Sequence, residues 1–351
     1  MIVLSSADVA ALLPMETAIE VVAGAMVAVS AGKANLPLRS LVDVGGANRL
    51  GIMPGALADP ACYGVKLLSL FPDNPADGYS SHEGAMVLFE ARHGMVVAMV
   101  NAGPLTAIRT AAASAVATRT LARPEASVLA IVGTGEQADH HIDAMLAVRP
   151  VGELRIAGRT DAKADALARK AATRHPQVKI STGTDIRAAV EGADIVCTVT
   201  AADEPILSGE WIAAGTHLNV VGSSIPSKRE IDEEMVARAA VFVDYRPSTF
   251  AQAGEIIRAI ESGRIGREHV RAEIGEVLAG KHGCRPDHAL SLARHRRAGP
   301  RLRRLLRGAG KGARAGRHRA ARIATKRRPR GFPISAAHRR GNPAAPGRPR
   351  P

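Results

Sequence analysis

The sequence is poor in cysteine and aromatic residues, and it has no long uninterrupted apolar run. Its three cysteines, Cys62, Cys197 and Cys284, are widely separated, so neither a disulfide framework nor a zinc site is expected. No apolar run reaches the roughly 20 residues of a membrane-spanning helix. The start, MIVLSSAD, lacks the basic and apolar regions of a signal peptide. These absences predict a cytoplasmic protein with no membrane segment and no metal.

Acidic residues are almost absent from one end of the chain. Residues 285–351 contain 21 Lys and Arg but one acid, Asp287. The preceding residues contain 26 Lys and Arg against 32 Asp and Glu, which is a net charge of −6 within a whole-chain charge of +14. The positive charge therefore belongs to a tail, and the body has no nucleic-acid signature.

The tail, residues 283–351, has no apolar periodicity, and a composition of Arg, Ala, Gly, His and Pro buries too little apolar surface to fold. Three interpretations are open: out-of-frame translation after GEVLAGK, a disordered extension, or an arm that binds nucleic acid nonspecifically. Phe332 is the one aromatic residue of the tail, which gives little support to base stacking. We favour the change of frame, so nucleic acid is not an expected partner.

From Ser127 onward, apolar strands alternate with helices. The predicted strands are SVLAIV, ELRIAG, VKIS, DIVCTVT, HLNVVG and AVFVDY, and the predicted helices begin near Glu136 and cover 161–175, 185–192 and 228–239. Continuous apolar strands of this kind are typical of a parallel sheet that is covered on both faces. We therefore predict an α/β fold with a Rossmann-type doubly wound sheet over residues 119–282.

Residues 1–118 mix short helices and strands in an α+β pattern. Helix-type spacing follows Ser6 and Pro14, and strands are predicted in 63–74 and 83–103 with a hairpin tip at 92–94. An Ala-rich helix suited to close packing covers 105–122. This segment is predicted to be a separate domain.

A glycine turn, GTGEQA at 133–138, follows the first strand of the regular region and opens a helix. Gly133 permits the tight turn, Gly135 lets a pyrophosphate approach the backbone, and Ala138 lets helix and strand pack closely. The helix N-terminus then offers N–H groups to the phosphates. A plain strand–helix turn is the alternative, but the context favours a dinucleotide site.

The end of the next strand bears on the choice of cofactor. Arg159 and Thr160 stand where an acid usually binds the ribose 2′-hydroxyl. A cation and a hydroxyl suit a 2′-phosphate, which favours NADP(H). Asp161 follows and keeps NAD(H) open, and Arg159 has the alternative of a solvated loop residue.

Three cations in the first domain have apolar or small neighbours: Arg39, Lys66 and Arg109. Each alone is explained by a side chain that reaches solvent, because Lys and Arg are seldom fully buried. Together they indicate a carboxylate pocket, since Arg binds carboxylates bidentately. A lysine in a dry pocket exchanges its proton easily.

These motifs resemble the ornithine cyclodeaminase/μ-crystallin family over residues 1–282, through YGVKLLSLFPDN, SSHEGAMVLFE, GPLTAIRTAAASAVATRTLARPEASVLAIVGTGEQA and THLNVVGSSIPSKREID. The resemblance implies an NAD(P)-binding Rossmann domain and a substrate domain that also forms a homodimer. It implies that Arg39 and Arg109 bind the substrate carboxylate and that Lys66 is the active-site lysine. The expected cofactor contacts are Gly133, Thr134, Gly135, Glu136, Gln137, Arg159, Thr160 and Thr110.

One departure from the family decides between its reactions. Cyclodeaminases of the family carry an aspartate in the loop where this chain has Ser224, and the pocket segment 49–54 contains no acid. A serine hydroxyl is a poor proton acceptor, and ornithine cyclisation needs acid–base handling of two amino groups. We therefore expect Ser224 to contact substrate and the chain to reduce a cyclic imine carboxylate to an L-amino acid. Ornithine cyclodeamination and non-catalytic binding of NADP(H) or a small ligand are the alternatives.

The remaining polar candidates receive structural interpretations. His82 is expected to be a loop or core histidine, and Glu83 is a weaker acid–base candidate. His140 and His141 are adjacent on a helix and point in different directions, so they are not expected to bind a metal together. Trp211 is expected to be a packing residue.

Overall fold

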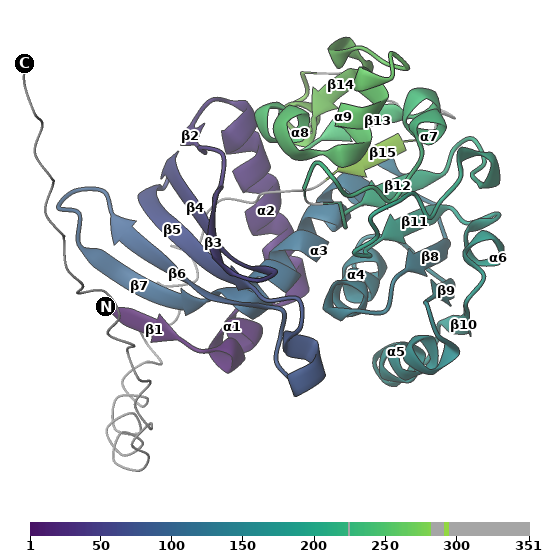
Figure 1. The fold of residues 1–351 in the computed structure, drawn as a ribbon, viewed down its shortest axis with the longest axis horizontal. Helices are drawn as coiled ribbons and strands as arrows, with labels where there is room; N and C mark the ends of the chain where they lie inside the picture. Colours follow the sequence, from purple (N-terminus) through teal and green to yellow (C-terminus); the bar gives the residue numbers. More distant parts are fainter. Residues whose placement is uncertain (224, 282–290, 295–351) are drawn as a thin grey trace, which may run out of the picture. The chain divides into compact units, whose positions relative to one another are not determined.

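The structure is a computed structural model that describes residues 1–223, 225–281 and 291–294. Its strands form two sheets, and the long helix α3 (Ala102–Leu121) connects them in sequence (Figure 1). The predicted domain boundary at 118 falls near the end of this helix. Most residues of α3 are buried, and its alanines allow close packing against both α2 and α4.

The first sheet is mainly antiparallel, in the order β1-β7-β6-β5-β4-β2, with β3 paired to β4. Only β1 runs parallel to its neighbour, β7. The turn between β6 and β7 confirms the predicted hairpin tip at 92–94. The strands are β1 (Ile2–Leu4), β2 (Ala34–Asn35), β3 (Ser40–Gly45), β4 (Asn48–Ala58), β5 (Ala61–Leu70), β6 (His82–Glu90) and β7 (Val96–Asn101), and the 3-10 turn η1 (Asn74–Asp77) follows β5.

Helices α1 (Ser6–Leu12), α2 (Met15–Ser30) and α3 pack together on one side of this sheet. The predicted helix starts are confirmed, with Ser5 and Asp8 forming a capping box at α1 and Pro14 preceding α2. Leu68, Leu88 and Val100 are buried. Because side chains alternate between the two faces of a strand, their neighbours in sequence lie on the opposite face of the sheet.

The second sheet confirms the predicted doubly wound fold. Its order is β10-β9-β8-β11-β12-β15-β13-β14, and every pairing is parallel. The strands are β8 (Val128–Val132), β9 (Glu153–Ala157), β10 (Lys179–Gly183), β11 (Ile195–Thr198), β12 (His217–Val220), β13 (Ala240–Val243), β14 (Val270–Glu273) and β15 (Ser291–Arg294).

Apolar clusters lie on both faces of this sheet. Leu129 and Ile131 belong to a cluster with residues of α3, α4 and α5, whereas Ala130 and Val132 belong to one with residues of α6, α7 and α9. Alternate residues of one strand therefore face opposite cores. The helices are α4 (Glu136–Leu146), α5 (Asp161–Arg174), α6 (Ile186–Val190), α7 (Glu233–Arg238), α8 (Arg246–Gln252), α9 (Gly254–Glu261) and α10 (Ile274–Leu278), with 3-10 turns η2 (Gly209–Trp211) and η3 (Arg267–His269).

Two details differ from expectation. The helix predicted over 228–239 begins only at Glu233, because Asp232 caps it and Ile231 bridges to Leu207; the prediction is wrong for 228–232. The strand β15 comes from the segment expected to be a tail and lies between β12 and β13. The rest of 283–351 lies outside the described residues. Within the described residues no single helix is long and apolar enough to cross a membrane; α1 and α2 meet those criteria only as a pair bent by 84°.

Candidate active site

The glycine turn joins β8 to α4 as expected. Gly133 has φ +125° and donates its N–H to Ala157 O at 2.9 Å, so the turn contacts the end of β9. A Cβ on Gly133 would lie 3.0 Å from Val199 O, in the loop after β11. Gly135 is the N-cap of α4, and an added Cβ there would meet nothing within 4 Å. The turn is thus closely packed at Gly133 and open at Gly135.

The sheet order places this turn at a topological switch point. The chain goes outward from β8 through β9 to β10, then returns to β11 on the other side of β8. Ligands of doubly wound sheets bind in the crevice outside the carboxyl ends of the strands at such a point. Three loops border it here: the glycine turn, residues 199–202 after β11, and residues 221–223 after β12.

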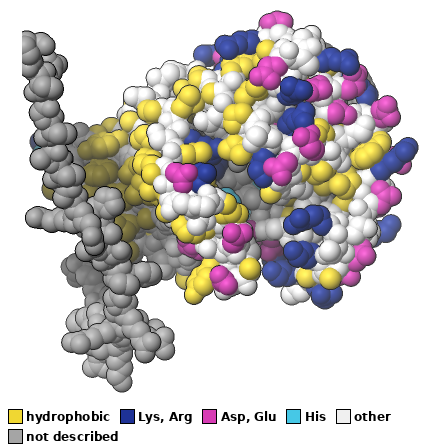
Figure 2. Space-filling view, in the orientation of Figure 1, with side chains coloured by type: hydrophobic (Ala, Val, Ile, Leu, Met, Phe, Trp, Pro, Cys, Tyr) yellow, Lys and Arg dark blue, Asp and Glu magenta, His cyan; other side chains and the backbone are white. Residues whose placement is uncertain are grey.

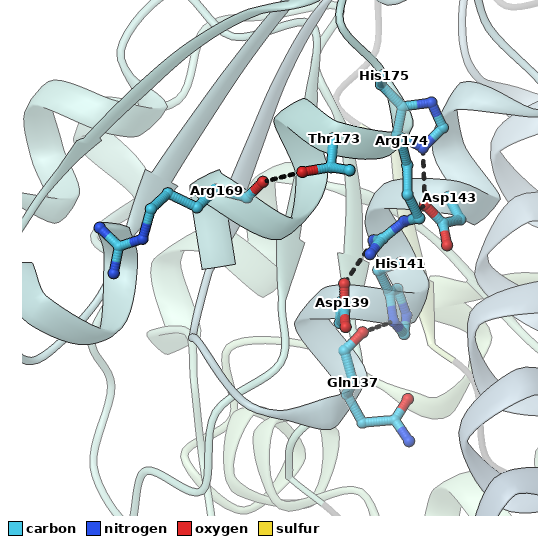
Figure 3. Close-up of polar contacts among 8 residues, drawn as sticks. All are labelled: Gln137, Asp139, His141, Asp143, Arg169, Thr173, Arg174 and His175. Carbon is cyan, nitrogen blue, oxygen red and sulfur yellow. Dashed lines mark hydrogen bonds and ion pairs between the residues drawn. The ribbon is translucent and has the colours of Figure 1, made fainter. Parts of the chain in front are cut away.

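Buried and ionic contacts fix the position of α4. Arg174 on α5 pairs with Asp139 at 2.5 Å and with Asp143 at 3.0 Å, and His175 also contacts Asp143 at 2.7 Å (Figure 3). From the opposite side, the buried His141 contacts Ser114 Oγ at 2.9 Å. These contacts hold α4 between α5 and α3, which keeps the helix N-terminus under the turn.

His141 is buried whereas His140 is only partly buried, as expected for adjacent residues of a helix. The Nδ1 of His141 lies 2.7 Å from the carbonyl oxygen of Gln137, so this nitrogen carries the proton and donates it. Burial lowers the pKa of His141 to about 4, which keeps the ring neutral. His141 is therefore a core residue. Among the described residues, no three His, Cys, Asp or Glu side chains are grouped as a metal site.

The crevice has an unsatisfied polar atom that fits a cofactor. Gln137 Oε1, in the first turn of α4, is buried and has no hydrogen-bond partner within the described residues. A buried acceptor without a partner is costly, by about 1–3 kcal/mol. A ribose hydroxyl of a dinucleotide could donate to this oxygen, whereas the phosphate oxygens only accept and need the helix N–H groups. The N-cap Gly135 has no side chain to occupy those N–H groups. These observations fit a bound dinucleotide.

The end of β9 lies beside the glycine turn. A Cβ on Gly158 would lie 2.6 Å from Thr134 Cγ2, so the strand end and the turn are in close contact. Arg159 and Thr160 follow directly and are exposed, with Thr160 as the N-cap of α5. Both residues are accessible at the edge of the crevice where the ribose is expected.

The register of the first sheet aligns the candidate substrate residues. Met53, Lys66 and Met86 are directly opposite one another on β4, β5 and β6. Arg39 directly precedes β3, and continuing the register by one residue places it opposite Met53. Directly opposite residues share a face, so Arg39 and Lys66 lie on the same face of the sheet.

That face meets α3. Lys66 Nζ donates to Thr106 Oγ1 at 3.4 Å, and Arg109 and Thr110 are three and four residues further along the helix. Residues at this spacing share a helix face. Lys66 and Arg109 are half-buried, and Thr110 is buried. Figure 2 shows the molecule from one side, and on that side Lys and Arg side chains lie around a hollow near the middle.

Two further titratable groups, His82 and Glu136, have shifted pKa values. Partial burial and the Lys66 cation both lower the pKa of His82, which favours its neutral form. The pKa of Glu136, in the first turn of α4, is raised by burial and by Glu83, and His140 opposes the shift. The start of β6 is therefore electrostatically coupled to the start of α4. His82 is the first residue of β6 and keeps part of its surface exposed to solvent, so it is neither the loop nor the core histidine expected from the sequence.

Two other predictions have different outcomes, and one buried residue was not predicted. Ser224 lies outside the described residues, so its expected substrate contact stays a prediction. Trp211 packs partly buried against the apolar cluster around α7, which agrees with a packing role. Sequence reasoning missed Glu230, a fully buried carboxylate beneath the loops after β11 and β12. Nothing in KREID identified it, because its partners lie far away in the sequence.

A doubly wound sheet with a glycine turn at its switch point, beside a sheet face that carries cations, is the layout expected of a two-part dinucleotide-dependent enzyme. Residues 1–290 match the model of the ornithine cyclodeaminase/mu-crystallin family. The mouse ketimine reductase mu-crystallin is 34% identical over 253 residues, which cover 72% of this chain and 76% of that protein. An uncharacterized cyclodeaminase from Sinorhizobium fredii is 42% identical over 219 residues, covering 62% of this chain and 66% of that protein. The chain belongs to the ornithine cyclodeaminase/mu-crystallin family.

Solved structures agree with this assignment. The Thermococcus litoralis Δ1-pyrroline-2-carboxylate reductase, in complex with NADH and L-proline, has a TM-score of 0.83 and 31% identity, and covers 90% of this chain and 98% of that one. An archaeal alanine dehydrogenase dimer with bound NAD has a TM-score of 0.79 and 27% identity, covering 90% and 97%. This chain is accordingly an NAD(P)-dependent enzyme of the oxidoreductase or cyclodeaminase type, acting at a carbon–nitrogen bond.

Proposed function

We propose that this chain reduces a cyclic imine carboxylate of the Δ1-pyrroline-2-carboxylate type to the L-amino acid, with NADPH as the favoured donor and NADH as the second. One observation carries the proposal: Lys66 stands on the sheet face that meets α3, in line with Arg39 and bonded to the helix that bears Arg109. This arrangement supports a carboxylate site with a proton donor beside it.

In the proposed mechanism, Arg39 and Arg109 hold the substrate carboxylate by charge-assisted hydrogen bonds. Lys66, directly or through a water that it holds, keeps the imine nitrogen protonated. The nicotinamide, when bound, supplies a hydride to the imine carbon. The C=N π bond becomes an N–H and a C–H bond, so each turnover consumes one proton and one reduced cofactor. The protonated imine is the better hydride acceptor, because its carbon is more electron-poor.

The cofactor contacts are proposed to divide between the two halves of the crevice. The turn Gly133–Gln137 would hold the pyrophosphate, supported by the open position at Gly135 and the N–H groups at the start of α4. Arg159 and Thr160 would hold the 2′-phosphate of NADP(H), and Thr110 would face the cofactor from α3. The exposure of Arg159 beside the turn supports the preference for NADP(H).

Ornithine cyclodeamination is the alternative within the family. The presence of Ser224 in place of an acid, and the lack of an acid in segment 49–54, favour reduction. The two reactions are distinguished by following NADPH and NADH absorbance after adding Δ1-pyrroline-2-carboxylate, with ornithine plus NAD in parallel. Cofactor consumption with the imine supports reduction. Proline formed from ornithine without net cofactor consumption contradicts it.

We also propose that the chain forms a homodimer through the outer face of the first sheet. Val3, Val42 and Met99 are 63%, 45% and 39% exposed, and Tyr63 adds to the same apolar face. An exposed apolar face of this kind marks an interaction surface. Light scattering with size-exclusion chromatography should give the mass of two chains, and Met99→Lys should shift it toward one. A wild-type mass of one chain would contradict the proposal.

A further inference from the structure

One buried carboxylate joins two loops of the crevice. Glu230 Oε2 accepts hydrogen bonds from Thr198 Oγ1 at 2.8 Å and from the Gly222 N–H at 2.6 Å. Its Oε1 accepts from the Thr200 N–H at 2.6 Å and from Thr200 Oγ1 at 2.7 Å. Thr198 and Thr200 lie at the end of β11, whereas Gly222 follows β12. Both oxygens are therefore used to fix the ends of two neighbouring strands relative to each other.

The close approach of these loops depends on a glycine. A Cβ on Gly222 would lie 2.0 Å from Thr200 O and 2.5 Å from Glu230 Oε1. A second buried carboxylate, Glu255 at the start of α9, accepts from Ser223 Oγ and, at 3.2 Å, from the backbone N–H of Glu230. The loop after β12 is thus held from below by two carboxylates.

The same segment also holds the loop after β11 from its outer side. Lys228 Nζ donates to Ala201 O at 2.8 Å and pairs with Asp203 at 3.4 Å. Residues 228–230 therefore contact most of the loop that follows β11. These residues are not helical because their backbone and side chains bond to the loops beside the crevice. Helix α7 therefore begins only after Asp232.

A buried carboxylate is not needed merely to hold two loops together. Burial and the neighbouring Glu255 raise the pKa of Glu230, while the hydrogen bonds from Thr200 and Gly222 act against the shift. Burying a carboxylate costs several kcal/mol, and apolar residues of similar size often stabilise a fold as well or better. A carboxylate, however, fixes four donors in one geometry, so its benefit is the precision of the loops.

We propose that Glu230 is the positioning residue for the nicotinamide half of the cofactor site, because it fixes the loops after β11 and β12 that border that half of the crevice. This inference rests on the proposed function. In a doubly wound sheet each half binds one mononucleotide. The glycine turn and Arg159 belong to the first half, on β8 and β9, and the loops that Glu230 holds belong to the second.

The test compares binding of NADPH with binding of 2′-phospho-ADP-ribose, which lacks the nicotinamide. In Glu230→Gln the amide nitrogen faces one backbone N–H, that of Thr200 or of Gly222, and cannot accept from it. We expect the Kd of NADPH, measured by its fluorescence, to rise at least about tenfold, as for the loss of one charge-assisted hydrogen bond. The Kd of the fragment, measured by calorimetry, should change by less than about twofold.

A second variant keeps the test decisive if Glu230→Gln does not fold. Thr198→Val removes one donor from a fully buried position that cannot itself touch the cofactor, and Thr198→Ser restores the hydroxyl. We expect the valine variant to weaken NADPH binding selectively and the serine variant to recover it. Glu234→Gln, on the exposed side of α7, is the control that should leave both Kd values unchanged.

The outcomes separate the two proposals. If the Kd values of NADPH and of the fragment rise equally in the variants, or if the Kd of NADPH does not rise, the role of Glu230 is overturned. The proposed reduction is unaffected by either result. Wild-type protein that binds neither NADPH nor NADH overturns the proposed function, and the role of Glu230 with it.

Discussion

Lys66 on β5 and Thr106 on α3 are joined by a hydrogen bond of 3.4 Å between Nζ and Oγ1. This contact brings a half-buried cation of the sheet against the helix that carries Arg109. An ammonium group carries three donors, which suits the proton-donating role proposed for Lys66.

Replacement of Lys66 by methionine should abolish imine reduction while leaving the cofactor bound. Lys66→Met keeps most of the length of the side chain but removes the proton donor. Loss of a general acid lowers kcat by about 10²- to 10⁴-fold. The measurement is NADPH oxidation with Δ1-pyrroline-2-carboxylate, together with NADPH binding by fluorescence. Lys179→Met, at a lysine whose side chain is 77% exposed on β10, is the control. A Lys66 variant with normal kcat would refute the assigned role.

The two glycines of the phosphate turn should respond differently to alanine. Gly133→Ala places a side chain at φ +125° and 3.0 Å from Val199 O, so it should lower thermal stability, with backbone strain alone costing roughly 1–3 kcal/mol. Gly135→Ala meets nothing within 4 Å, so stability should stay near wild type. Its methyl group should instead hinder the pyrophosphate and raise the Kd of NADPH. Melting curves and NADPH titrations check the pair, and equal behaviour of the two variants would contradict the assignment.

Arg159 should control the choice between the two nicotinamide cofactors. Arg159→Ala removes the cation expected to bind the 2′-phosphate, so the KM of NADPH should rise about tenfold or more. The KM of NADH, which has no such phosphate, should stay within about twofold. Arg169→Ala removes another exposed arginine, on α5, whose side chain points away from the α4–α5 contacts (Figure 3), and is the matched control. If the KM values of NADPH and NADH rise equally, Arg159 does not bind the 2′-phosphate.

The buried His141 should make stability depend on pH in a defined direction. Its pKa is about 4 in the folded protein and about 6.5 when unfolded. Between these values the unfolded chain binds more protons, so the free energy of unfolding rises with pH and is lost as pH falls from 6.5 toward 4. The slope from this group is at most about 1.4 kcal/mol per pH unit.

The measurement is urea unfolding of the wild type and His141→Gln at pH 7 and pH 5. The variant should be less stable at pH 7, because the contacts with Ser114 and Gln137 are altered, but its loss of stability between the two pH values should be smaller. Other titrating groups are shared by both proteins and cancel in the comparison. An unchanged pH dependence would show that His141 takes up its proton without unfolding.

The sequence predicted those features that depend on local pattern. The doubly wound sheet follows from apolar runs that alternate with helices, and the turn at Gly133 follows from its place between a strand and a helix. The convergence of Arg39, Lys66 and Arg109 could be suspected from their apolar neighbours, but it needs the strand register to be seen. The family resemblance supplied their roles, and Lys66→Met tests the role of the lysine.

Features that depend on distant partners could not be predicted. Glu230 receives its hydrogen bonds from residues 8 to 32 positions earlier in the chain, and the charged pattern around it resembles an exposed helix. The strand β15 has no apolar period to identify it, because its place is set by backbone pairing with β12 and β13. In both cases the information lies in contacts and not in local composition.

The position of β15 also has a consequence for the order of assembly. The last strand in the described sequence fills an interior position of the second sheet, between two strands that are synthesised earlier. Until Ser291–Arg294 emerges from the ribosome, β12 and β13 each present an unpaired edge, the kind of surface that promotes association between chains. Completion of the second sheet therefore waits for Ser291–Arg294, and the nascent chain carries a gap between β12 and β13 until then.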